Sequence, residues 1–269
     1  MIDLLKFDFV RNALVAGVLA SVVCGIIGPY VVVRRITFIS GGISHAAFGG
    51  IGLGYLLGIN PIWGAISFAL FSALVMGLVV ERTRLPEDTV IGILWAGGMA
   101  LGVIFVGLSP GYAPDLFGYL FGNILTVPSS DIVLMSVLCL IIISVVFSLY
   151  KEFLAISFDE EFAAVVGVPV RSLYVVLLCL IALTVVILIR IVGVILVIAL
   201  LTIPAAISGQ FTYNLKRMML LSIILGVIFT FSGLWLSVVL NIASGATIIL
   251  VSVAGFFVGL SKNLFGGKK

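Results

Sequence analysis

The chain has 269 residues and a net charge of +3, and its composition is 63% hydrophobic and only 9% charged. A water-soluble domain of this length needs far more charged residues on its surface, so the composition excludes the soluble globular class. A charge this small also gives no basis for binding nucleic acid.

Apolar runs of about 17–25 residues recur along the chain, which is the length that crosses the hydrocarbon core as a helix. They lack the alternation of a membrane barrel. We therefore expect an all-α polytopic membrane protein, a single domain over residues 1–269 with eight or nine membrane-spanning helices. Residues 172–209 are too long for one span, which predicts a tight turn near Arg190. The nine candidate spans are residues 10–33, 36–58, 61–80, 89–108, 131–150, 172–189, 192–209, 218–240 and 246–261.

Lysine and arginine predict the orientation of these spans. When the connection at Arg34 and Arg35 is placed inside, eleven of the 14 basic residues face the cytoplasm. Only Lys6, Arg11 and Arg190 face outward. Because basic residues are enriched on the cytoplasmic side, we expect a multi-pass protein of the cell membrane, inner or plasma, with a cytoplasmic C-terminus.

The second predicted span, with six glycines between residues 40 and 54, contains the only histidine, His45. An ionisable residue inside a span is a candidate functional residue, and imidazole is a common ligand of transition metals. His45 is therefore a candidate residue of a transport pathway. The alternative is a neutral histidine that forms a hydrogen bond between helices.

Residues 109–127 form a long outer connection. Its first part, up to Pro114, is rich in turn residues, and residues 115–125 are typical of a short aromatic helix. This helix is too short to span the membrane, so we expect an interfacial or re-entrant helix at the outer mouth. The alternative is an element of the aromatic belt with no role in transport.

An acidic segment, Ser157–Pro169, interrupts the apolar runs. Three consecutive carboxylates, Asp159–Glu161, precede helix-forming residues, and Gly167 and Pro169 end the segment. Such a segment cannot lie in hydrocarbon, so it predicts a short cytoplasmic helix presented to a partner protein. The alternative is a solvated loop.

The source of energy for transport is also constrained by the sequence. The chain has no GxxxxGK[ST] loop for ATP phosphates, and no carboxylate lies at the middle of a predicted span, where an ion-coupled carrier usually needs one. These features favour a transport subunit that is driven by a separate ATPase. A membrane anchor without a pathway and a secondary carrier remain the alternatives. In a late span, Pro204 is either a hinge or a static kink.

Four motifs resemble the permease subunit of the zinc/manganese/iron ABC importer family. They occur in order along nearly the whole chain, at Ile43–Ala46, Tyr119–Leu125, Ser157–Pro169 and Leu200–Ala206. The resemblance implies a type II ABC importer-like permease that is not itself an enzyme. It carries a divalent transition metal as substrate and has no permanently bound cofactor. The implied partners are two ATP-binding cassette ATPase subunits, an extracytoplasmic metal-binding protein, a second copy of the chain and membrane lipid.

The resemblance also assigns roles to residues. The acidic helix becomes the coupling helix that docks on the ATPase, through Asp159, Glu160, Glu161, Phe162, Val165, Val166 and Gly167. His45 becomes a contact of the passing metal. Family members usually have an aspartate one turn before this histidine, where this chain has Gly41. The missing oxygen ligand could come from Ser40, Ser44, Asn123, water or the second copy.

Overall fold

A computed structural model describes residues 7–83, 85–110 and 116–265, and these residues form helices and connections without a strand. Because hydrocarbon offers no hydrogen-bond partners, each helix satisfies its own backbone groups. The helices are α1 (Asp8–Val33), α2 (Thr37–Leu57), α3 (Pro61–Arg82), α4 (Glu87–Leu108), α5 (Leu116–Phe121), the 3-10 helix η2 (Ile124–Thr126), α6 (Ser129–Ser148), α7 (Tyr150–Phe158), α8 (Glu160–Val165), α9 (Val170–Phe211), α10 (Leu215–Leu240) and α11 (Ser244–Phe265).

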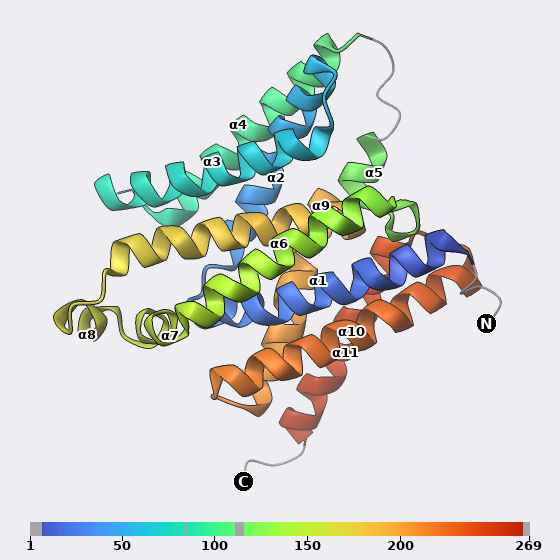
Figure 1. Cartoon of the computed structure of the whole chain (residues 1–269). Helices are drawn as coiled ribbons and strands as arrows, with labels where there is room; N and C mark the ends of the chain where they lie inside the picture. The colour runs from blue at the N-terminus through green and yellow to red at the C-terminus, as the bar shows by residue number, and fades with distance from the viewer. Residues whose placement is uncertain (1–6, 84, 111–115, 266–269) are drawn as a thin grey trace.

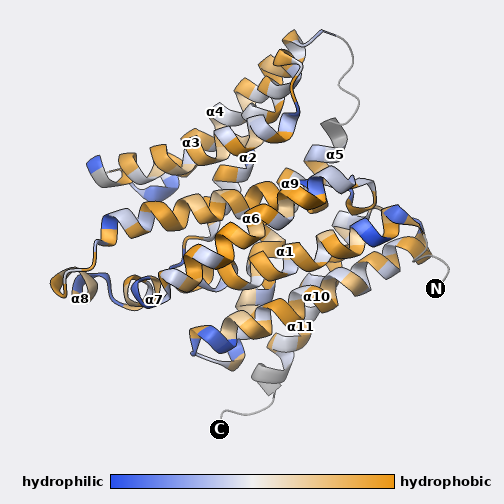
Figure 2. Cartoon of the chain, in the orientation of Figure 1, coloured by the Kyte–Doolittle hydropathy of each residue, from blue (hydrophilic) through white to orange (hydrophobic). Residues whose placement is uncertain are grey.

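Seven helical segments in the described residues are long and apolar enough to cross a membrane: α1, α3, α4, α6, the first part of α9, α10 and α11. The predicted second span is the glycine-rich α2, with 21 residues. The predicted seventh span is the shorter apolar segment Val197–Phe211. Polar residues gather at the helix ends and apolar residues fill the middles (Figure 2). The prediction of an all-α polytopic membrane protein is therefore confirmed.

The long helices form two groups with α9 between them (Figure 1). One group is α2, α3 and α4, in which α2 packs extensively against both neighbours. The other contains α1, α10 and α6, with α11 against α10 and α9. Glycines allow close packing in the first group, because a Cβ on Gly50 or Gly64 would overlap the backbone of the other residue. In lipid, no hydrophobic driving force brings helices together, so close packing of small residues such as these contributes to their association.

The tight turn that was predicted near Arg190 is a sharp bend in α9 at Gly193. This glycine has φ 76° and ψ 164°, while the residues on both sides remain helical. A second left-handed glycine, Gly122 with φ 70°, follows α5 and packs directly on the backbone at Val192 and Gly193. The bend therefore has a physical cause, since only glycine adopts this backbone conformation and permits this contact.

Replacing Gly193 with alanine should destabilise the protein strongly. The backbone conformation alone costs about 1–3 kcal/mol, and the new Cβ would overlap the backbone of Leu120, Phe121 and Gly122. The control is Gly107→Ala on α4, where a Cβ meets no atom within 4 Å. Thermal unfolding in detergent should show a lower Tm for Gly193→Ala and an unchanged or slightly higher Tm for the control. Equal Tm values would contradict this role of the bend.

The bundle has two distinct ends, at opposite sides of Figure 1. We call the end with α7 and α8 the α8 end; it also holds the α1–α2 turn and the starts of α4, α9 and α10. We call the other end, with α5, η2 and the start of α1, the α5 end. Strongly hydrophilic residues are conspicuous at the α8 end (Figure 2).

Candidate functional site

His45 belongs to α2 and lies inside the bundle, where its side chain contacts α4. Its Nδ1 atom is 3.4 Å from the Sδ atom of Met99, and its ring stacks on Trp95 with the ring centroids 4.0 Å apart and an interplanar angle of 12°. Trp95 and Met99 are four residues apart on α4, so they share one face of that helix. The histidine is 9% exposed and both α4 residues are half-buried, so the contact lies at the margin of the core.

A side chain at position 41, one turn before His45, would have to displace the end of the Ile198 side chain. A Cβ on Gly41 would overlap the end of the Ile198 side chain and would lie 3.3 Å from the Trp95 ring. The described residues contain no group of three or more histidine, cysteine, aspartate or glutamate side chains that could hold a metal. Within one chain, the side chains that contact His45 at this site are those of Met99 and Trp95.

The two candidate serines are buried beside this site on α2. The Ser40 hydroxyl donates to the carbonyl of Thr37 at 2.8 Å, and the Ser44 hydroxyl donates to the carbonyls of Gly41 at 2.8 Å and Val194 at 3.2 Å. Ser44 thus ties α2 to the bend in α9. Each hydroxyl proton is committed to the backbone, so these side chains offer only oxygen lone pairs.

Asn123, the third candidate helper, caps η2 at the α5 end. Its Oδ1 atom accepts a hydrogen bond from the backbone N–H of Leu125 at 3.1 Å. Within the described residues, no hydrogen bond or ring contact joins it to His45. The predicted outer aromatic helix is present as α5, followed by η2, although residues 111–115 of that prediction lie outside the described residues.

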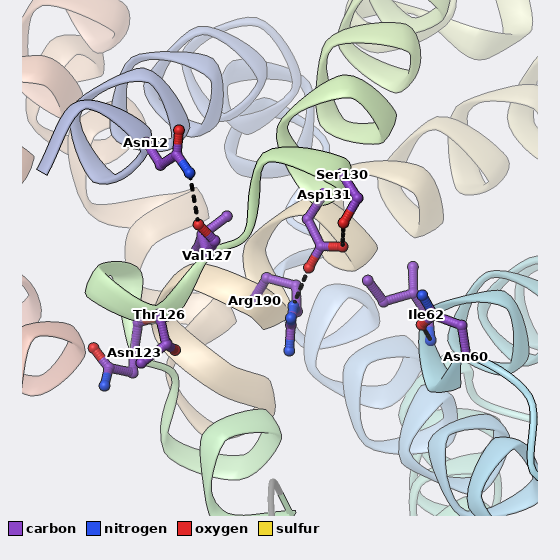
Figure 3. Close-up of polar contacts among 9 residues, drawn as sticks. All are labelled: Asn12, Asn60, Ile62, Asn123, Thr126, Val127, Ser130, Asp131 and Arg190. Atoms are coloured by element: carbon purple, nitrogen blue, oxygen red, sulfur yellow. Dashed lines mark hydrogen bonds and ion pairs between the residues drawn. The ribbon is translucent and has the colours of Figure 1, made fainter. Parts of the chain in front are cut away.

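A buried ion pair fixes the α5 end. Arg190 Nε lies 2.6 Å from Asp131 Oδ2 (Figure 3). The guanidinium carbon of Arg190 also lies 4.9 Å from the centroid of the Tyr119 ring. The ion pair joins α9 just before its bend to the first turn of α6. The sequence carried a signal for it, since Arg190 and Asp131 both lie at span ends on the same predicted side.

The acidic segment forms a short capped helix, α8. Asp159 Oδ1 accepts a hydrogen bond from the N–H of Phe162 at 2.9 Å, as an N-cap does. At the other end, Gly167 has φ 85°, and the N–H of Val168 reaches the carbonyl of Ala163 at 3.0 Å. A left-handed glycine with this hydrogen bond is a common helix stop. The predicted short helix at this end of the bundle is therefore present.

One face of α8 is apolar and is left uncovered by the part of the chain that the structure describes. Phe162 is 61% exposed, Val165 is 85% exposed and Val166 is 56% exposed, whereas Ala163 on the opposite face is fully buried. Glu161 is also exposed. We call Phe162, Val165 and Val166 the α8 patch.

Arg34 holds α8 in place through contacts that the sequence analysis missed. Its guanidinium forms an ion pair with Glu160 and donates to the carbonyl of Ile156. The central carbon of the Arg34 guanidinium also lies over the ring of Tyr174, 5.2 Å from the ring centroid. The Tyr174 hydroxyl in turn donates a hydrogen bond to Glu87 at 3.3 Å. These contacts join α8 to the turn that leads into α2 and to the first turn of α4. Those are the two helices that carry His45 and Met99.

Pro204 is buried in the second part of α9, within backbone of helical conformation. The non-helical residue in α9 is Gly193, eleven positions earlier. The hinge role of Pro204 remains a hypothesis, and the bend that the structure contains has a different cause.

Comparison with known proteins decides the family. A model of the ABC 3 transport family matches residues 6–263. The chain belongs to the ABC 3 transport family. Among its relatives, an uncharacterized membrane protein of Synechocystis sp. is 49% identical over 97% of this chain and 93% of its own. The manganese transport system membrane protein MntC of Listeria innocua is 36% identical over 95% and 91%.

Solved structures agree with this family assignment. PsaBC from Streptococcus pneumoniae, solved in complex with Fab, matches with a TM-score of 0.87 and 33% identity, covering 96% of this chain and 93% of that chain. The family membership and this fold identify a multi-pass metal ABC permease, a transport subunit rather than a catalytic enzyme. They bear out the resemblance that the four motifs indicated.

Proposed function

We propose that this ABC 3 family member is the membrane-spanning subunit of an ATP-driven importer of divalent transition metals. Two copies of the chain form the pathway, and each copy docks one ATP-binding cassette ATPase at the α8 end, which faces the cytoplasm together with the C-terminus. An extracytoplasmic metal-binding protein delivers the metal at the α5 end. The membrane is the inner or plasma membrane of the cell.

The observation that carries this proposal is the α8 patch. An exposed apolar surface on a membrane protein's polar end favours a protein partner, and the cap at Asp159 together with the Arg34 contacts holds this surface in a fixed orientation. An apolar helix face that fits a groove is a recurrent mode of recognition. The Listeria relative is described as part of a manganese transport system, which supports a metal as substrate.

The pathway is proposed to pass His45, between two copies of the chain. On α4, the helix that contacts His45, glycines at positions 92 and 97 are exposed, and no atom lies within 4 Å of a Cβ built on either. Large apolar residues such as Ile93 and Val103 are also exposed on α4, at 62% and 61%. This helix therefore has surface for a second copy next to the His45 contact.

Mass measurement of the detergent-solubilised complex tests the assembly. We expect two copies of the chain with two ATPase subunits, because each chain has a single coupling helix and one His45 site. A stable complex of one chain with one ATPase would contradict the proposal. A membrane anchor would leave ATP turnover unresponsive to delivered metal, and a secondary carrier would take up metal from an ion gradient without any ATPase.

Replacing Phe162 and Val165 together with alanine should release the ATPase, because most of the exposed apolar area of α8 is lost. The matched control is Phe257→Ala with Val258→Ala on α11, two neighbouring residues that are 61% and 59% exposed. Co-purification with the ATPase should fall by about tenfold or more for the α8 variant, since hot-spot residues contribute about 2 kcal/mol or more. Equal loss in both variants, or none in either, would remove α8 from the docking surface.

A further inference from the structure

A groove at the α8 end shares no lining residue with the His45 site or the α8 patch. It lies between the end of α6, with the following α7, and the start of α10, which are at the same end of the bundle (Figure 1). Both α6 and α10 pack against α1, and Ile26 of α1 lines the groove between them. Its volume is about 710 Å³. Sites for small molecules usually measure about 300–1,000 Å³, so the groove is large enough to hold one.

The part of the groove toward the membrane is apolar. Phe147 near the end of α6 and Leu220 on α10 line it, and these side chains are 77% and 60% exposed. Ile223, almost one turn farther along α10, continues the apolar lining. Because α6 and α10 are long and apolar enough to cross a membrane, these side chains lie where acyl chains would contact them. A ligand with a hydrocarbon chain could therefore bury that chain here.

Toward the polar end, the lining of the groove is basic. Lys151 is the second residue of α7 and Lys216 is the second residue of α10, and both are exposed. The Nζ atom of Lys216 lies 4.9 Å from the centroid of the Tyr150 ring, a cation–π contact that directs this amine toward α7. Among the described residues, neither lysine forms an ion pair with a carboxylate. The carboxylate of Glu152 also lines the groove, so two amines and one carboxylate leave the lining with a net positive charge.

Ser148, the last residue of α6, adds a hydroxyl to this basic part of the groove. Ser136, on the same helix, donates its proton to the carbonyl of Ile132 at 2.8 Å. The Ser148 hydroxyl forms no such bond within the part of the chain that the structure describes, and its side chain is exposed. Hydrogen bonds from cationic groups to phosphate are strong, and lysine is a common phosphate-binding residue. Two amines and a hydroxyl above an apolar surface therefore match a phosphate that is attached to hydrocarbon.

We propose that this groove binds an anionic phospholipid. Its phosphate lies at Lys151, Lys216 and Ser148, and an acyl chain follows the apolar lining at Phe147 and Leu220. Basic pockets between membrane helices are a known kind of site for anionic headgroups. A free phosphate ion would leave the apolar half of the groove unused. The bound lipid joins α7, which leads into α8, to the start of α10. This site lies outside the proposed metal pathway and adds to the proposed function a lipid that contacts the helix before the coupling helix.

Native mass spectrometry of the purified full chain in detergent tests the proposal. Phosphatidylglycerol and phosphatidylcholine with the same acyl chains are added at equal concentrations, so that they differ in headgroup charge. Wild type should retain phosphatidylglycerol about fivefold or more better. Lys151→Gln and Lys216→Gln should each weaken that retention about fivefold, which is the usual contribution of one lysine near anionic lipid. Lys216→Arg keeps the charge and should retain the lipid as wild type does.

The matched control is Arg35→Gln, because Arg35 is an exposed basic residue at the α8 end that does not line the groove. Removal of its charge should leave the retention of phosphatidylglycerol unchanged. Glu152→Gln should strengthen the retention, because it removes the negative charge from the lining. The two variants therefore distinguish charge in the groove from the general charge of this end.

Three outcomes would overturn the proposal. Equal retention of the two lipids by wild type would show that the groove does not select an anionic headgroup. A loss in Arg35→Gln as large as in the lysine variants would place the interaction outside the groove. Displacement of phosphatidylglycerol by an equal concentration of inorganic phosphate would show that a free anion occupies the site. None of these measurements involves transport, so their failure is distinguishable from failure of the proposed function.

Discussion

Replacing Arg34 with alanine should reduce the rate of ATP-driven metal uptake by about tenfold or more. A tenfold change corresponds to about 1.4 kcal/mol in the activation free energy of transport. Arg34 joins α8 to the turn before α2, and its ring contact with Tyr174 continues to Glu87 at the start of α4. Without the guanidinium, movement of the ATPase would still displace α8 but would reach α2 and α4 less effectively. The expected signature is ATP hydrolysis that continues while uptake falls.

The matched variant is Arg34→Lys, which keeps the charge and loses the planar fork that reaches Glu160 and the Ile156 carbonyl together. It should give an intermediate uptake-to-hydrolysis ratio. Uptake and hydrolysis should be measured on the same vesicles. If Arg34→Ala lowers both in parallel, Arg34 only stabilises the docked ATPase; if it lowers neither, the Arg34 contacts do not transmit the movement.

Replacing His45 with alanine should lower metal uptake at least about tenfold, because the proposed pathway loses the imidazole nitrogen that would contact the metal. Assembly with the ATPase should survive, since the α8 patch lies at the end of the bundle and His45 lies within it. A role in packing predicts a different pattern. Loss of the stack on Trp95 would lower stability, and uptake would fall only in proportion to the folded complex.

His45→Gln separates these two roles, because the amide keeps a polar planar group against Trp95 without an imidazole nitrogen. Uptake per assembled complex should be as low as in His45→Ala. Uptake near that of wild type in His45→Gln would show that a hydrogen-bonding side chain suffices at this position, and His45 would then be a packing residue.

Local chemistry explains which features were predictable from the sequence. The capped ends of α8 follow from an acidic residue before a helical stretch and a glycine after it, and Asp159 and Gly167 occupy those positions. The membrane-spanning helices follow from apolar runs of sufficient length. The break in α9 was placed within three residues, since Arg190 and Gly193 interrupt a run that is too long for one span.

The remaining contacts join residues that are far apart in the sequence. Arg34 meets Glu160 across 126 positions, and His45 meets Met99 across 54. Periodicity and capping rules describe neighbours along one helix, so they cannot pair residues across helices. The contact of Met99 with His45 was also hard to predict, because a methionine in an apolar span resembles any other core residue.

The most direct test of metal import is an uptake assay with radiolabelled zinc. The vesicles contain two copies of this chain with their ATPase subunits, and the metal is supplied at the α5 end. The vesicles should accumulate zinc only when ATP is supplied to the α8 end, and His45→Ala should reduce that accumulation without changing the amount of assembled complex. Accumulation that proceeds from an ion gradient without ATP, or that is unchanged in His45→Ala, would contradict an ATP-driven pathway past His45.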